Sequence, residues 1–266
     1  MDLLAKRITE LTESQTLAMA ARSRELAAQG IDVINLSLGE PDFPTPSHVK
    51  EAAKRAIDQN FSFYTPVAGF ADTRAAIVEK LRRDNQLHYT PEQIVTSTGA
   101  KQSLINVLLC LLNPGDEILV PTPYWVSYLS MIQLAEAKAI LLPTGVESNF
   151  KISPEQLEAA ITPNTKAFIF SSPCNPTGTV YNRSELEALA AVFERHPQIT
   201  VISDEIYEYI RFEGKHESIA SIGQMQARTV VVNGLSKGFA MTGWRFGYIA
   251  APLPIAQACV KLQGQF

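Results

Sequence analysis

The chain has 266 residues, of which 46% are hydrophobic and 19% charged, and its formal net charge is −4. This is the composition of a globular protein with ample material for a core, and its scattered basic residues argue against a nucleic-acid or anionic-membrane partner. Three widely separated cysteines, four histidines without metal-ligand spacing and no signal peptide lead us to expect a cytoplasmic protein without a metal site.

Apolar, β-branched runs alternate with helical patterns along the chain. The runs predict strands at residues 33–36, 93–97, 117–120, 137–142, 166–170, 199–203 and 228–232. The helical patterns cover residues 14–29, 47–58, 70–83, 100–112, 125–135, 154–161 and 184–195, with Ser153 and Ser184 as expected N-caps. This alternation predicts an α/β fold with a mostly parallel central sheet and helices on both faces.

Loops rich in Gly, Pro, Asn and aromatic residues follow six of these strands. They read "SLGEPDFPTP", "TGAKQ", "PTPYW", "SSPCNPTG", "DEIYEY" and "NGLSKGFAMTGWR" in chain order. In open parallel sheets ligands bind beyond the carboxyl ends of the strands. We therefore expect the six strand ends to form one crevice.

Two of these loops suit the fixed ends of a ligand. In "TSTGAKQ" a glycine at a strand-to-helix junction, Gly99, lets backbone N–H groups approach a phosphate, although a simple turn explains the pattern equally well. In "SPCNPTG" two X-Pro bonds, one of them expected to be cis, can hold the Asn175 amide as a rigid donor; the alternative is a plain tight turn.

The last two loops carry the charged candidates. Asp204 ends an apolar strand, with Tyr207 three residues on, and it is either a charge partner for a cation or a helix cap beside a core tyrosine. Lys237 lies between two glycines, with Arg245 eight residues later. A partly desolvated lysine near a second cation is suited to covalent chemistry, whereas the alternative is an ordinary surface lysine.

Taken together, these residues describe a single ligand. It has a phosphate, a basic ring atom, a hydrogen-bonding oxygen, a flat face and an electrophilic carbon. Pyridoxal 5′-phosphate (PLP) has all five features. The phosphate is assigned to Gly99 and Arg245, the basic ring atom to Asp204, and the hydrogen-bonding oxygen to Asn175 and Tyr207. The flat face is assigned to Trp125 and the electrophilic carbon to Lys237.

The chain resembles the class I aminotransferases of the aspartate aminotransferase family, which are fold-type I PLP enzymes. The resemblance rests on "NLSLGEPDFPTP", "YTPVAG", "TGAKQ", "PTPYWVSY", "SPCNPTG", "SDEIYE" and "SKGFAMTGWRFGY", which occur in family order. It implies an N-terminal arm and part of a small domain at residues 1–45, and a PLP-binding large domain at residues 46–266. The large domain is expected to be incomplete, because the family continues beyond "KLQGQF".

The resemblance also implies a role for each matched residue. Lys237 bonds covalently to the cofactor and moves the proton, Asp204 pairs with the ring nitrogen, and the bonds before Pro123 and Pro176 are cis. The remaining cofactor contacts are expected from Gly99, Ala100, Lys101, Trp125, Asn175, Tyr207, Ser236 and Arg245. Gly39, Trp125 and Asn175 are expected to contact substrate. Tyr64 is expected to reach the phosphate of a neighbouring subunit, which implies a homodimer.

The function implied is PLP-dependent transfer of an amino group from an L-amino acid to a 2-oxo acid by a ping-pong mechanism. Aspartate and 2-oxoglutarate are the expected pair, and aromatic, branched or prephenate-like substrates are the alternatives. Two departures are Gly234, where some members have a serine, and the family's missing C-terminal part, which supplies an arginine for the substrate carboxylate. The alternatives are a catalytically impaired PLP-binding fragment and another fold-type I enzyme, a β-lyase or a decarboxylase. A Rossmann nucleotide-binding protein is disfavoured, because no GxGxxG follows the first strand.

Overall fold

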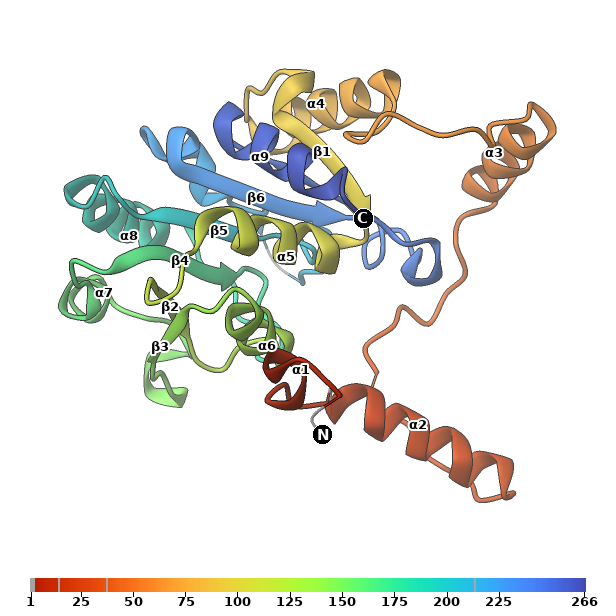
Figure 1. Ribbon diagram of the computed structural model, residues 1–266, viewed down its shortest axis with the longest axis horizontal. Coiled ribbons are helices and arrows are strands. Elements are labelled where there is room, and N and C mark those ends of the chain that lie inside the picture. Colours follow the sequence, from red (N-terminus) through yellow and green to blue (C-terminus); the bar gives the residue numbers. More distant parts are fainter. Residues whose placement is uncertain (1–2, 14, 37, 213) are drawn as a thin grey trace.

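One seven-stranded sheet forms the centre of the protein in a computed structural model, which describes residues 3–13, 15–36, 38–212 and 214–266 (Figure 1). The strand order is β1-β7-β6-β5-β4-β2-β3. Strands β2 to β6 pair in parallel, whereas β7 is antiparallel to both β1 and β6. The bounds are β1 Ile94–Thr98, β2 Glu117–Pro121, β3 Lys138–Leu142, β4 Thr165–Ser171, β5 Thr200–Asp204, β6 Thr229–Gly234 and β7 Phe246–Ala250.

Helices cover both faces of this sheet, which confirms the predicted fold class. One face packs against α5 (Ala100–Leu111), α6 (Ser127–Leu134) and α9 (Leu253–Gln263). The other packs against α4 (Ala71–Asn85), α7 (Pro154–Ala160) and α8 (Arg183–Arg195). Successive residues of β2 alternate between the faces, since Ile118 and Val120 belong to the α5 side and Leu119 to the α8 side. No helix in the described ranges has both the length and the hydropathy needed to cross a bilayer.

The N-terminal segment lies mostly outside these layers. It contains α1 (Lys6–Thr9), α2 (Gln15–Ala28) and α3 (Ser47–Asp58), and a long connection between α2 and α3 (Figure 1). The predicted strand at residues 33–36 is wrong: this stretch is irregular, with Ile34 86% and Leu36 90% exposed. Its apolar side chains match the strand pattern, but a strand needs a ladder partner and a surface to pack on. The domain boundary at residue 45 stays a prediction.

Element ends differ from the sequence prediction in two further places. The cap of α8 is Asn182 rather than Ser184, because the Asn182 side chain accepts a 3.0 Å hydrogen bond from the Glu185 amide. Ser153 caps α7 as expected. Strand β7 (Phe246–Ala250) and helix α9 (Leu253–Gln263) were not predicted, and the motif "SKGFAMTGWRFGY" groups the first residues of β7 with the preceding loop.

A buried network of charged side chains joins α4 to the loop after β5. His216 Nε2 lies 2.8 Å from a Glu205 carboxylate oxygen. Glu208 pairs with Lys80 of α4 and accepts a 3.0 Å hydrogen bond from Asn85. Ligand atoms of Glu205, Glu208 and His216 come within 4.8 Å of one another, but each carboxylate already has a nitrogen partner. The network therefore serves as a link between α4 and the end of β5.

The pair Glu205–His216 makes the fold sensitive to pH. Burial alone would lower the pKa of His216, but the Glu205 carboxylate outweighs it and raises that pKa above 6.5. Burial would likewise raise the pKa of Glu205, but His216 and two serine hydroxyls hold it below 4.5. The stability that protonated His216 contributes is lost as the pH rises through the pKa of His216 in the folded chain. The stability that ionised Glu205 contributes is lost as the pH falls through the pKa of Glu205 in the folded chain. The pair therefore contributes fully between pH 4.5 and 6.5.

We predict that His216→Gln lowers the free energy of unfolding at about pH 6 by roughly 3 kcal/mol, because it leaves Glu205 buried without its cation. Raising the pH to about 9 is expected to destabilise the unmodified chain more than the variant, which has no imidazolium to lose. Urea unfolding followed by circular dichroism measures both effects. His88→Gln, at an exposed histidine, is the control, and equal pH slopes for the unmodified chain and His216→Gln would contradict the prediction.

Candidate active site

The carboxyl ends of the central strands meet at one edge of the sheet. Ser171 of β4 pairs with Asp204 of β5, and Asp204 in turn pairs with Val232 of β6. Because β7 is antiparallel, its first residue lies at this same edge, so Arg245 arrives beside Gly99. Five of the six predicted strand ends thus converge as expected.

The sixth loop reaches this edge without a strand before it. Lys237 Nζ donates a hydrogen bond to the carbonyl oxygen of Gly39. Thr242 Oγ1 donates to Glu40 Oε1 at 2.7 Å, and Thr45 Oγ1 donates to a main-chain carbonyl of the lysine loop at 2.6 Å. These contacts dock residues 39–45 on the lysine loop even though residues 33–36 are irregular.

A candidate anion site lies where β1 leads into α5. Gly99 has φ +85°, and a Cβ there would lie 2.4 Å from Arg245 Nη2, so a larger residue would collide with the guanidinium. Arg245 is fixed by hydrogen bonds to the carbonyl oxygens of Thr242 (2.9 Å) and Thr98 (3.4 Å). The free amides of a helix N-terminus and a guanidinium therefore face the same space, which suits a phosphate.

The helix end is also held close to β7. A Cβ at Gly247 would lie 2.1 Å from the Ala100 amide nitrogen, so only glycine allows this approach. Lys101 Nζ lies 5.0 Å from the Trp125 ring centroid, and burial, followed by the charge of Arg245, lowers the pKa of Lys101. The predicted phosphate-turn residues and Trp125 are thus brought together.

A buried carboxylate lies at the end of β5. Asp204 is 5% exposed, and it accepts hydrogen bonds from the Tyr128 hydroxyl at 2.7 Å and the Ile206 amide at 3.3 Å. Burial raises the pKa of Asp204 to about 6, although both hydrogen bonds oppose this shift. Such a carboxylate is suited to pair with a buried cation. Tyr128 was not predicted; its one sequence signal is a helical position three residues after Trp125.

An amide and a phenol stand beside this carboxylate. Asn175 Nδ2 donates to the Tyr207 hydroxyl at 3.4 Å. The expected cis bonds before Pro123 and Pro176 are present, and a third, unpredicted one precedes Pro173. Two hydrogen-bonding groups therefore point to one side of the site, as the sequence predicts.

Lys237 lies between these two ends of the site. Its ammonium nitrogen is 5.9 Å from the Tyr207 ring centroid. Burial lowers the pKa of Lys237, with a smaller contribution from Arg245, while Glu40 opposes the shift. Ser236 is buried beside it. A lysine that loses its proton more readily than usual can act as a nucleophile and as a base.

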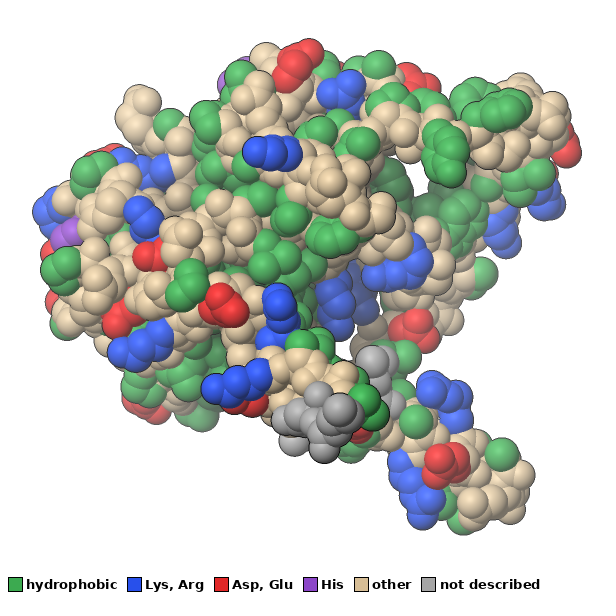
Figure 2. Space-filling model, in the orientation of Figure 1, with side chains coloured by type: hydrophobic (Ala, Val, Ile, Leu, Met, Phe, Trp, Pro, Cys, Tyr) green, Lys and Arg blue, Asp and Glu red, His purple; other side chains and the backbone are tan. Residues whose placement is uncertain are grey.

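Tyr64 is the predicted residue that lies apart from the others. It follows α3 and is 106% exposed. Basic side chains lie along the hollow between the layered body and the N-terminal helices, as Figure 2 shows. That hollow leaves room for a neighbouring chain, but the contribution of Tyr64 to a second site stays a prediction.

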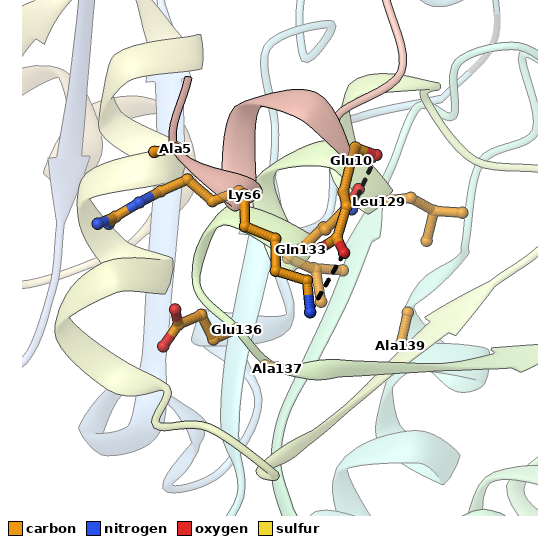
Figure 3. A pocket seen from close by; sticks show the side chains of 10 residues that line it. Ala5, Lys6, Glu10, Leu129, Gln133, Glu136, Ala137 and Ala139 are labelled. Atoms are coloured by element: carbon orange, nitrogen blue, oxygen red, sulfur yellow. Dashed lines mark hydrogen bonds and ion pairs between the residues drawn. The ribbon is translucent and has the colours of Figure 1, made fainter. Parts of the chain in front are cut away.

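A cavity of about 620 Å³ between α1 and α6 is a separate feature (Figure 3). Some of its polar groups contact one another, since Lys6 pairs with Glu10 at 3.5 Å and Gln133 donates to the Glu10 carbonyl at 3.1 Å. None of the predicted site residues lines it. This cavity is therefore distinct from the candidate site at the strand ends.

The donor set at the strand ends suits PLP. The turn at Gly99 and Arg245 offers an anion site, the buried Asp204 carboxylate suits a protonated ring nitrogen, and Lys237 suits an aldehyde carbon. The structure thus places three complementary groups at the same edge of the sheet.

Comparisons with known proteins agree with this interpretation. The family model for aminotransferase class I and II matches residues 31–266. The aspartate/prephenate aminotransferase of Cereibacter sphaeroides is 49% identical over all of this chain and 67% of its own length. The aspartate aminotransferase of Bacillus subtilis is 46% identical over 97% of this chain and 66% of its own. The chain spans about two thirds of the length of these relatives.

Solved structures show the same kinship. The aspartate aminotransferase of Thermus thermophilus with maleate superposes with a TM-score of 0.96 and 44% identity, covering 100% of this chain and 69% of that one. The aspartate aminotransferase of Thermotoga maritima gives a TM-score of 0.92 at 38% identity. The chain therefore belongs to the class I and II aminotransferases, a family of PLP-dependent transaminases, and has the fold-type I architecture.

Proposed function

We propose that this chain carries the PLP site of an enzyme that transfers the amino group of L-aspartate to a 2-oxo acid. The observation that supports it most is the half-buried Lys237, with a lowered pKa, between the Asp204 carboxylate and the Gly99–Arg245 turn. Relatives named for aspartate and for aspartate and prephenate support the donor. We propose 2-oxoglutarate as one acceptor and a prephenate-like 2-oxo acid as another.

Lys237 has two tasks in this proposal. When bound, PLP supplies a ring that accepts the electron pair left behind as the amino acid loses its Cα proton. The Lys237 amine takes that proton and later returns it, which its lowered pKa favours. Asp204 holds the ring nitrogen protonated, because a buried carboxylate is most stable beside a cation.

The other residues fix the position of the reacting groups. The amides at Gly99 and Ala100, with the Arg245 guanidinium, hold the phosphate. Asn175 and Tyr207 donate hydrogen bonds to the oxygen on the ring. Anchoring the molecule at both ends leaves only a small tilt between steps, and such positioning lowers the entropic part of a barrier.

The remaining assignments extend this site toward substrate and cofactor. Trp125 packs against the ring face with Lys101 behind it, and Ser236 supports the phosphate end. Trp125 and Asn175 also contact the amino acid. The backbone at Gly39, which already meets Lys237, contacts the substrate carboxylate.

We also propose a homodimer. No side chain of α3 is buried, and the exposed apolar residues that follow or end it include Ile57, Phe61, Phe63 and Tyr64. A second copy of the chain is expected to cover this surface and to receive Tyr64 in its phosphate site.

Three free cysteines, Cys110, Cys174 and Cys259, support a cytoplasmic location.

We predict that borohydride treatment of the chain with PLP leaves a phosphopyridoxyl group on Lys237, found by peptide mapping. Lys237→Ala is expected to lose this adduct, whereas Lys261→Ala, at an exposed lysine of α9, keeps it. Transfer of ¹⁵N from L-aspartate to 2-oxoglutarate then tests the reaction. An adduct without any transfer would favour a β-lyase or decarboxylase, or an impaired PLP-binding chain.

Gly99→Ala is expected to weaken PLP binding by tenfold or more, because its Cβ would displace the Arg245 guanidinium. About 1.4 kcal/mol of lost interaction corresponds to this factor. Gly115→Ala is a matched control, since Gly115 has a similar φ of +89° but no atom near the new Cβ. Fluorescence titration with PLP measures both, and equal weakening in the two variants would show that backbone strain, not the guanidinium, is responsible.

Mixed dimers test the role of Tyr64. Tyr64→Phe is expected to weaken PLP binding and Lys237→Ala to abolish the adduct. Mixing the two variants creates sites in which an intact Lys237 receives an intact Tyr64 from the other chain, so labelling at low PLP concentration recovers in part. Mixing without recovery, in a sample shown by sedimentation to be dimeric, would mean that Tyr64 does not act across the interface.

A further inference from the structure

Tyr128 lies beneath the site and has a role that the family assignment does not give it. It belongs to α6 and is 1% exposed. Its ring meets that of Trp125 edge to face, with centroids 5.6 Å apart and planes at 88°. A buried phenol needs a partner for its hydroxyl, and here that partner is a carboxylate of the site.

The Tyr128 hydroxyl links two parts of the site. It has one proton, which it donates to Asp204 Oδ2 at 2.7 Å, so its lone pairs remain free to accept. Burial raises the pKa of Tyr128 and the neighbouring Ser171 side chain opposes this shift, while Ser171 Oγ accepts a 3.4 Å hydrogen bond from the main-chain amide of Asn175. Tyr128 is therefore hydrogen bonded to Asp204 and lies near the side chain that supports the start of the Asn175 loop.

Asp204 depends on this contact for its orientation. Oδ2 receives the short hydrogen bond from Tyr128, whereas Oδ1 receives a 3.3 Å bond from the Ile206 amide. The two carboxylate oxygens of Asp204 are thus held by hydrogen bonds of different length. Rotation of the carboxylate would break the shorter one, from Tyr128. Hydrogen bonds to a charged group are about twice as strong as those between neutral groups.

We propose that Tyr128 is a positioning residue that holds the Asp204 carboxylate ionised and aimed at the ring nitrogen of the cofactor. This inference rests on the proposed function, because that function gives Asp204 its partner. Tyr128 acts through Asp204 and, by its ring, through Trp125. It therefore lies between the residues that are proposed to contact the ring nitrogen (Asp204), the ring face (Trp125) and the ring oxygen (Asn175).

The charges around Asp204 give the sign of the effect. Burial raises its pKa to about 6, Tyr128 and the Ile206 amide lower it, and the neighbouring Glu205 carboxylate raises it. Tyr207, the other ionisable side chain facing Asp204, is itself neutral because burial raises its pKa. Removing the Tyr128 hydroxyl takes away the largest of the opposing contributions. The pKa of Asp204 then rises, and more of the carboxyl is protonated near neutral pH.

The test compares Tyr128→Phe with the unmodified chain. In the cofactor-free protein, the Asp204 carboxyl carbon is followed by ¹³C NMR from about pH 4 to 9, and its signal is identified by its loss in Asp204→Asn. We expect the midpoint in Tyr128→Phe to lie about one pH unit or more above that of the unmodified chain. The dissociation constant for PLP at about pH 7, measured by fluorescence, is expected to rise about tenfold.

Two further variants separate positioning from general damage. Tyr181→Phe removes another buried tyrosine hydroxyl, one that accepts a 3.0 Å hydrogen bond from the Ile152 amide, and is expected to leave the Asp204 midpoint unchanged. In an Asp204→Asn background, Tyr128→Phe is expected to change PLP affinity by less than about twofold, because the two residues act as a unit.

An unchanged Asp204 midpoint in Tyr128→Phe, or an equal shift in Tyr181→Phe, would overturn the proposal. So would fully additive losses of PLP affinity in the double variant. The titration needs no cofactor, so its outcome is independent of whether Lys237 forms an adduct. Failure of the proposed function and failure of this inference are therefore distinguishable.

Discussion

The site depends on a buried carboxylate that the described part of the chain does not pair with a side-chain cation. Asp204 ends β5 at 5% exposure, and its partners there are a phenol and a backbone amide. Burying such a charge costs stability, and hydrogen bonds recover only part of the loss. In the proposed function a cationic ring would supply the missing partner, so that the strand end would form half of an ion pair completed by the ligand. The next residue, Glu205, shows the contrast, because it points elsewhere and is neutralised within the fold by His216.

The other end of the site, at Gly99 and Arg245, depends on backbone segments that pack closely together rather than on a buried charge. At Gly247 and at Gly234 an added Cβ would lie 2.1 Å and 2.7 Å from backbone atoms, so β7 lies directly against both β6 and the start of α5. That closeness explains why glycine is suited to position 234, where some family members have serine. It also explains why Arg245 can approach the helix N-terminus although it is not part of α5. The sheet therefore fixes how far the Gly99–Arg245 turn lies from the end of β5.

Most of the site could be predicted from sequence because its residues follow strands directly. Asn175, Asp204 and Lys237 each come within a few residues of a strand end, and parallel strands bring such ends together. Tyr128 could not be predicted in this way, since its partner Asp204 comes from another element and spacing along the chain carries no record of that contact. Glu205 and His216 lie in the same connection after β5, but no periodic pattern in the sequence marks their contact. Residues 33–36 have the apolar pattern of a strand, but a strand forms only when a second strand pairs with it. The pattern alone carries no information about such a partner, so the prediction there is wrong.

The segment at residues 39–45 bears on Lys237 although it is outside the sheet. Its carbonyl at Gly39 accepts a hydrogen bond from the lysine, its carboxylate at Glu40 raises the pKa of that lysine, and Thr45 attaches it to the lysine loop. Arg245, on the other side, lowers the same pKa. Burial is the main cause of the lowered pKa of Lys237, and two opposing charges adjust it, Glu40 on the docked segment and Arg245 just before β7. Side-chain and loop hydrogen bonds, rather than a strand ladder, hold that segment. Its docking therefore brings both a hydrogen-bond acceptor and a carboxylate to Lys237.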